Sequence, residues 1–73
     1  MNDIQVNFWV NHKKVGDVKL PPETTVLNVL MSAAEQGLIS DVVEMMSWKV
    51  RVNGSAKEMT DMVRDTDLVD VFQ

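Results

Sequence analysis

The sequence predicts a small α+β domain in which a mixed sheet of four to five strands packs on one main helix. Apolar and polar residues alternate near both ends of the chain, which predicts strands, and apolar residues recur at helical spacing in between. The expected order is ββαββ, with one short strand inside the second pair. The 73 residues, 45% of them apolar and 25% charged, predict a single globular domain over 1–73.

The first twenty residues predict an antiparallel hairpin. Residues 4–10 alternate as a half-buried strand does, with Trp9 on the polar face. Residues 11–14 are a polar break, and residues 15–20 predict a second strand. Pro21-Pro22 ends it, because proline cannot donate a backbone hydrogen bond to a sheet. The apolar face of the first strand is made by Ile4, Val6, Phe8 and Val10.

Residues 26–36 predict the main helix, about three turns long. Thr24 or Thr25 can cap its start with a hydroxyl, and Gly37 can supply the left-handed residue after its end. The apolar stripe that we expect to face the sheet is made by Val26, Val29, Leu30, Ala33 and Ala34.

Residues 38–47 admit two interpretations. A short helical turn capped by Ser40 is one, and a loop that packs on the core through Leu38 and Ile39 is the other. We expect the methionines around this segment to fill the core, rather than to form a binding surface. These methionines are Met45, Met46, Met59 and Met62.

The last third of the chain predicts further strands separated by turns. Residues 48–52 alternate as a third strand, and Asn53-Gly54 favours a tight turn because both residues tolerate positive φ. The following segments are expected to be a short strand at 55–58, one helical turn at 59–63, a turn at 64–67 and the last strand at 68–72.

Two stretches resemble ubiquitin-like proteins of the β-grasp superfamily. Residues 20–30, with Leu-Pro and then Thr-Val before the helix, are similar to the way these proteins begin their helix. Val50-Arg51-Val52-Asn53-Gly54 and residues 62–72 are similar to the end of the sulfur-carrier proteins of thiamine and molybdopterin synthesis. The resemblance covers most of residues 4–72. It implies a ubiquitin-like β-grasp fold, with the last strand beside and parallel to the first.

The chain also departs from the sulfur carriers. Those proteins need a flexible C-terminal Gly-Gly, because only glycine can thread into the narrow site of the activating enzyme. Here the sequence reads Val71-Phe72-Gln73, and Thr66 stands where the carriers have a glycine between two aspartates. The chain thus also resembles the RnfH-like ubiquitin-fold proteins, which lack this tail. It resembles, more loosely, the ubiquitin-like subunits of bacterial multicomponent monooxygenases.

These resemblances imply a non-conjugated ubiquitin-like module that binds another protein, as an adaptor or an assembly subunit. One alternative is a sulfur carrier or protein modifier whose Gly-Gly tail is absent from this chain. Another is a small accessory subunit of a multicomponent enzyme.

Composition excludes several other classes of function. Without cysteine there is no disulfide, thiolate nucleophile or cysteine-ligated zinc. The net charge of −4 disfavours nucleic acid; it fits simple solubility or a partner with a basic patch. No apolar run approaches the ~20 residues that cross a bilayer, and no signal pattern is evident, so we expect a cytoplasmic protein that does not bind membranes. No catalytic motif is present, so we expect neither enzymatic activity nor a cofactor.

The main candidate site is the sheet face opposite the helix. If Phe8 faces the core, Trp9 faces outward and Phe72 should lie beside it. An apolar pair flanked by cations is typical of protein-binding surfaces. In the alternative interpretation, Trp9 is covered by the chain's own loops or by a cation–π contact. The predicted protein-binding residues are Trp9, Lys49, Arg51, Leu68, Asp70 and Phe72.

Three further features of the sequence bear on metal binding and self-association. Asp65, Asp67 and Asp70 could hold calcium or magnesium, although we favour a solvated turn. His12, the only histidine, is expected to lie exposed in the hairpin loop without a metal-binding role. The exposed apolar pair can also bury itself in a second copy, so we expect a monomer or a weak homodimer.

Overall fold

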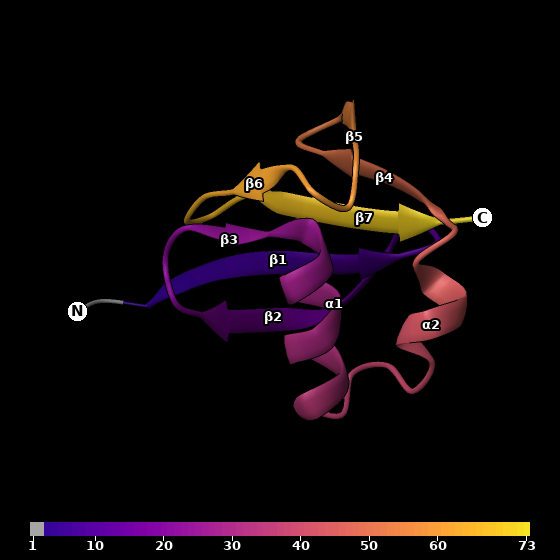
Figure 1. The fold of residues 1–73 in the computed structure, drawn as a ribbon, viewed down its shortest axis with the longest axis horizontal. Helices are drawn as coiled ribbons and strands as arrows, with labels where there is room; N and C mark the ends of the chain where they lie inside the picture. The colour runs from indigo at the N-terminus through magenta and orange to yellow at the C-terminus, as the bar shows by residue number, and fades with distance from the viewer. Residues whose placement is uncertain (1–2) are drawn as a thin grey trace.

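The computed structural model describes residues 3–73, and a mixed sheet of five strands forms its centre (Figure 1). The strands lie in the order β2-β1-β7-β4-β5. The pair β1–β7 is parallel, as expected, and the other three pairs are antiparallel. The strand bounds are β1 (Ile4–Val10), β2 (Lys13–Leu20), β4 (Lys49–Val52), β5 (Ser55–Lys57) and β7 (Leu68–Phe72).

One main helix, α1 (Val26–Glu35), lies across one face of this sheet (Figure 1). The α+β class, the mixed sheet and the single main helix are therefore confirmed. The element order differs from the predicted ββαββ, because three short elements are added to it. They are β3 (Thr24–Thr25), α2 (Val42–Met45) and β6 (Met62–Val63), of which β3 and β6 pair as a second, two-stranded sheet.

The first hairpin closes more tightly than predicted. Asn11 and His12 have φ values of 50° and 67°, so both central residues of the turn are left-handed. Such a turn matches the natural twist of the two strands, which lets β2 begin at Lys13 rather than at residue 15.

Helix α1 begins and ends close to the predicted residues. The Thr25 hydroxyl accepts a hydrogen bond from the Asn28 backbone N–H at 3.3 Å, which confirms Thr25 as the N-cap. Gly37 follows the helix with a φ of 82°, as expected for the left-handed residue. The residues that α1 buries are Val26, Val29, Leu30 and Ala33, whereas Ala34 is only half-buried.

The predicted helical turn at 59–63 is wrong. Met62 and Val63 instead form β6, and the segment before them accepts hydrogen bonds from the first turn of α1. The Val26 N–H donates to the Asp61 carbonyl at 3.0 Å, and the Leu27 N–H donates to the Met59 carbonyl at 3.0 Å. A helix cannot satisfy these first N–H groups itself, so the neighbouring turn before β6 does so here.

Residues 38–47 contain the short helix that one interpretation proposed, but Ser40 is not its cap. The Asp41 carboxylate accepts the Glu44 backbone N–H at 3.0 Å and caps α2. Leu38 and Ile39 are half-buried and pack against the core, as the other interpretation proposed.

The core lies between α1 and the sheet, with Phe8 and Leu30 as its largest fully buried side chains. The prediction that four methionines fill the core is wrong for two of them. Met45 is buried and Met59 packs against the core, but Met46 is 46% exposed and Met62 is 55% exposed. Met62 alternates with the buried Val63 on β6, so the two side chains point to opposite sides.

Over residues 3–73, no helix has both the length and the apolar character needed to cross a bilayer.

Candidate functional site

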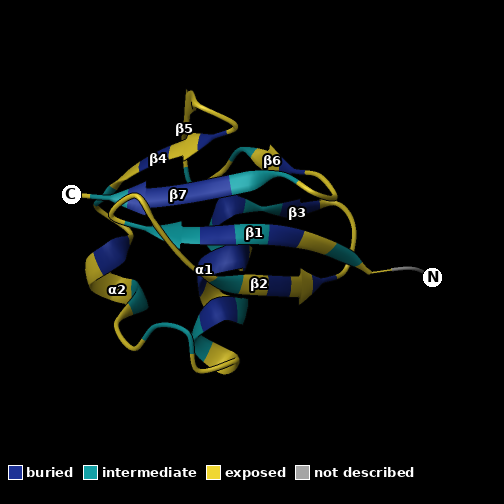
Figure 2. Ribbon diagram, turned by 180° about the vertical axis from the view of Figure 1, so that it is seen from behind, coloured by how far each residue is buried: buried dark blue, intermediate teal, exposed yellow. Residues whose placement is uncertain are grey.

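The candidate site is the side of the five-stranded sheet opposite α1, called here the outer face. Figure 2 views the molecule from this side, with the strands in front of the helix. On β1 and β4 the buried residues alternate with more exposed ones, whereas on β7 the outward-facing Asp70 is itself buried between its neighbours. This alternation places all six predicted residues on the outer face: Trp9, Lys49, Arg51, Leu68, Asp70 and Phe72.

Strand register decides which of these residues are direct neighbours. Asp70 lies between Trp9 on β1 and Arg51 on β4, and Phe72 lies opposite Lys49. The expected side-by-side placement of Trp9 and Phe72 is wrong, because the two residues are not paired directly across β1 and β7. Trp9 pairs with Asp70, and Phe72 lies two residues further along β7, in a diagonal position.

Phe72 is the aromatic centre of the outer face. Its ring centroid lies 4.7 Å from that of His12, at an angle of 38° between the planes. The Arg51 guanidinium carbon lies 5.6 Å from the same centroid, within cation–π range. The alternative interpretation of the sequence included a cation–π contact at Trp9, whereas in the structure Arg51 makes such a contact with Phe72.

His12 and Asp70 form the most buried polar contact of the outer face. His12 Nδ1 lies 2.6 Å from Asp70 Oδ2, and the His12 backbone N–H donates to Asp70 Oδ1 at 3.1 Å. His12 lies in the hairpin turn with its side chain 67% exposed, as expected, whereas the whole of Asp70 is only 8% exposed. Because the carboxylate accepts from Nδ1, it fixes the ring over Phe72 and leaves Nε2 as the other ring nitrogen available to a partner.

The sequence analysis missed this contact, since the two residues are 58 positions apart. The expected parallel pairing of the first and last strands could have indicated the contact, because it brings the turn after β1 to the end of β7.

The other two aspartates of the predicted cluster bind separate partners. Asp65 Oδ1 accepts the Gln5 backbone N–H at 2.8 Å. Asp67 accepts the Arg64 backbone N–H at 2.8 Å and the Asn53 side-chain amide at 2.9 Å. Within the described part of the chain, no three His, Asp or Glu side chains gather as metal ligands would. The structure thus uses these carboxylates to hold turns.

Trp9 is half-buried, so the chain itself covers part of the indole. Its Nε1–H is buried and has no hydrogen-bond partner among residues 3–73. Trp9 thus contributes an apolar edge to the outer face rather than a fully exposed ring.

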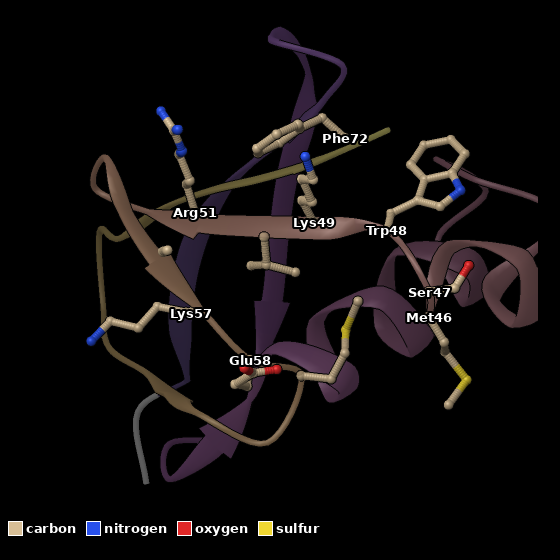
Figure 3. A pocket seen from close by; sticks show the side chains of 11 residues that line it. Met46, Ser47, Trp48, Lys49, Arg51, Lys57, Glu58 and Phe72 are labelled. Atoms are coloured by element: carbon tan, nitrogen blue, oxygen red, sulfur yellow. The ribbon is translucent and has the colours of Figure 1, made fainter.

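A pocket of about 440 Å³ lies where the outer face meets β5. Lys49 and Arg51 extend from β4 on the same side as Phe72 (Figure 3). Lys57 on β5 also lines the pocket, but it pairs with the buried Val50, so its side chain lies on the opposite side of the sheet from Lys49 and Arg51 (Figure 3). The pocket is completed by Met46, Ser47, Trp48, Val50, Ala56, Glu58 and Met59.

The charge of the outer face differs from that of the whole chain. Lys49 and Arg51 lie on the outer face, and neither makes an ion pair with a described carboxylate. The nearest buried carboxylate, Asp70, is occupied by His12. A chain of net charge −4 therefore presents a locally basic surface at this site.

Comparison with known proteins assigns no role to these residues. No protein-family model matches the chain, and no curated protein sequence matches it.

Proposed function

We propose that this chain is a non-conjugated ubiquitin-like protein of the β-grasp type that binds another protein through its outer face. In this role it acts as an adaptor or assembly subunit, and an accessory subunit of a multicomponent enzyme is one form of such a subunit. The strand order, with β1 and β7 parallel at the centre and α1 across one face, supports the β-grasp part of the proposal.

One observation carries the binding role: Phe72 lies among cations on a sheet face that no described helix covers (Figure 2). An aromatic side chain centred among polar and charged groups is the usual composition of a binding hot spot. Arg51 is already positioned over the ring, so less side-chain freedom is lost when a partner docks.

The cations indicate the chemistry of the partner. Lys49 and Arg51 have no carboxylate partner among the described residues, so a docking protein can supply one. We therefore propose a partner segment that places an apolar side chain against Phe72 and Asp or Glu side chains against these two cations.

Affinity capture with a charge-reversed variant tests this function. The double variant Lys49→Glu, Arg51→Glu changes two exposed positions of the outer face and should lose the partner that the unchanged chain captures from its source cells. The control Lys13→Glu, Arg64→Glu makes the same change in charge at two exposed positions outside the pocket and should retain it.

Far-UV circular dichroism verifies that both double variants are folded. Equal capture by the outer-face variant and the unchanged chain would contradict the proposed function, and so would equal loss in both variants.

A further inference from the structure

A second surface lies on the helical side of the molecule, away from the outer face. Side chains of α1 and α2 line a groove of about 470 Å³, which we call the methionine groove. Its lining residues are Leu27, Met31, Glu35, Val42 and Met46. Met31 was not among the residues predicted from the sequence. Its spacing of four from Leu27, which places both residues on one ridge of α1, could have indicated it.

The groove is apolar and open to solvent. Met31 is 50% exposed and Met46 is 46% exposed, and Val43 on α2 is also exposed. Methionine is flexible and polarizable, and exposed methionines occur on surfaces that accept apolar side chains of varied shape. Exposed apolar side chains add no stability to a small domain. Contiguous apolar surface of this kind is typical of a site that a partner covers.

The two helices that line the groove carry negative charge only. Residues 20–48, which include both helices, contain no Lys, Arg or His. The same segment contains Glu23, Glu35, Asp41 and Glu44. Glu35 lines the groove itself, and Glu44 lies on α2. The molecule therefore has a basic outer face and an acidic, apolar groove on the helical side.

We infer that the methionine groove binds a cationic amphipathic helix of a second protein. Leu27 and Met31 are four residues apart, about 6 Å along α1, which matches apolar side chains at i and i+4 of a docked helix. Lysines or arginines beside those apolar positions would meet Glu35, which lines the groove. An anionic ligand such as a fatty acid is disfavoured, because residues 20–48 offer its carboxylate no cation.

This inference goes beyond the proposed function, since it adds a surface of opposite charge, which has only Met46 in common with the lining of the pocket beside Phe72. A chain with both surfaces can bridge an acidic segment of one protein and a basic helix of another. Either surface can fail its test without affecting the other.

Methyl NMR with a designed probe tests the inference. The probe is a peptide of about 18 residues, long enough for five turns, with leucines on one helical face and lysines on the other. We expect the methyl signals of Met31 and Met46 to shift saturably, while the exposed Met62 serves as the internal control and stays in place. A scrambled peptide of equal composition and a leucine–glutamate peptide should leave all three signals unchanged.

Two variants locate the binding site. Met31→Lys should weaken the affinity by about tenfold or more, a loss of about 1.4 kcal/mol, whereas Met62→Lys should leave it within about twofold. Glu35→Lys changes only the charge at the rim and should also weaken binding, so the test stands even if Met31→Lys does not fold.

Three results would overturn the inference. One is the absence of saturable shifts at Met31 and Met46 with the leucine–lysine peptide. Another is an equal response to the leucine–glutamate peptide. The third is concentration-dependent self-association that Met31→Lys abolishes in sedimentation, which would assign the groove to a second copy of this chain.

Discussion

Asp70 shows how one polar residue of the outer face holds both a turn and an aromatic ring. Its carboxylate accepts two hydrogen bonds from His12, one from the backbone and one from the ring. The ring in turn packs on Phe72. A nearly buried carboxylate with these partners stabilises the hairpin turn, in which His12 adopts a positive φ.

We predict that Asp70→Ala lowers the free energy of unfolding by about 1–3 kcal/mol, because it removes both charge-assisted hydrogen bonds. The matched control is Asp17→Ala, which removes an exposed carboxylate paired with Lys14 at 3.2 Å and should cost less than about 0.5 kcal/mol. Urea unfolding at neutral pH measures both. Equal losses in the two variants would show that the contact with His12 adds no stability.

Individual residues of the outer face were predictable because the alternation of a strand is local. Lys49, Arg51 and Phe72 follow from a period of two in their own strands. The contact between His12 and Asp70 was not predictable in this way. It depends on the register between strands far apart in the chain, and no local pattern encodes that register.

Among the elements, the turn between β4 and β5 illustrates a link to a distant strand. Asn53 and Gly54 have φ values of 52° and 83°, as the Asn-Gly pair predicted. The Asn53 side chain also accepts the Leu68 backbone N–H and donates to the Asp67 carboxylate, each at 2.9 Å. The turn residue thus fixes the start of β7, which carries Asp70 and Phe72.

We predict that Asn53→Ala costs about 2 kcal/mol of stability, from the lost hydrogen bonds and from forcing alanine into the left-handed region. Asn53→Gly removes the same hydrogen bonds but tolerates the positive φ, so it should cost about 1 kcal/mol. Chemical denaturation of the two variants separates the contributions. A loss that is the same for both would mean that backbone strain plays no part.

The prediction of a helical turn at 59–63 failed because contact with α1, rather than local spacing, decides the structure of this segment. Local spacing of Met59, Met62 and Val63 suits one turn of helix. The first N–H groups of α1 need carbonyl partners, however, and Met59 and Asp61 provide them from a turn rather than from a helix. A tertiary requirement therefore overrode the local preference.

At the scale of the whole molecule, the two sides differ in charge and in apolar character. The net charge of −4 suggested a basic partner, and that description fits the helical side rather than the outer face. The average over the chain does not describe the outer face, where strand register places Lys49 and Arg51 beside Phe72. Strand alternation predicted these two cations there, whereas the net charge alone suggested the opposite sign for this surface.

The central claim is that the outer face is the surface that contacts the captured protein. Amide and indole NMR signals of the labelled chain, recorded while that purified partner is added, test it most directly. We predict saturable changes at Trp9, Arg51 and Phe72, with Met31 and Glu35 on α1 unaffected. Changes confined to α1 and α2, or an absence of saturable changes on β1, β4 and β7, would contradict the claim.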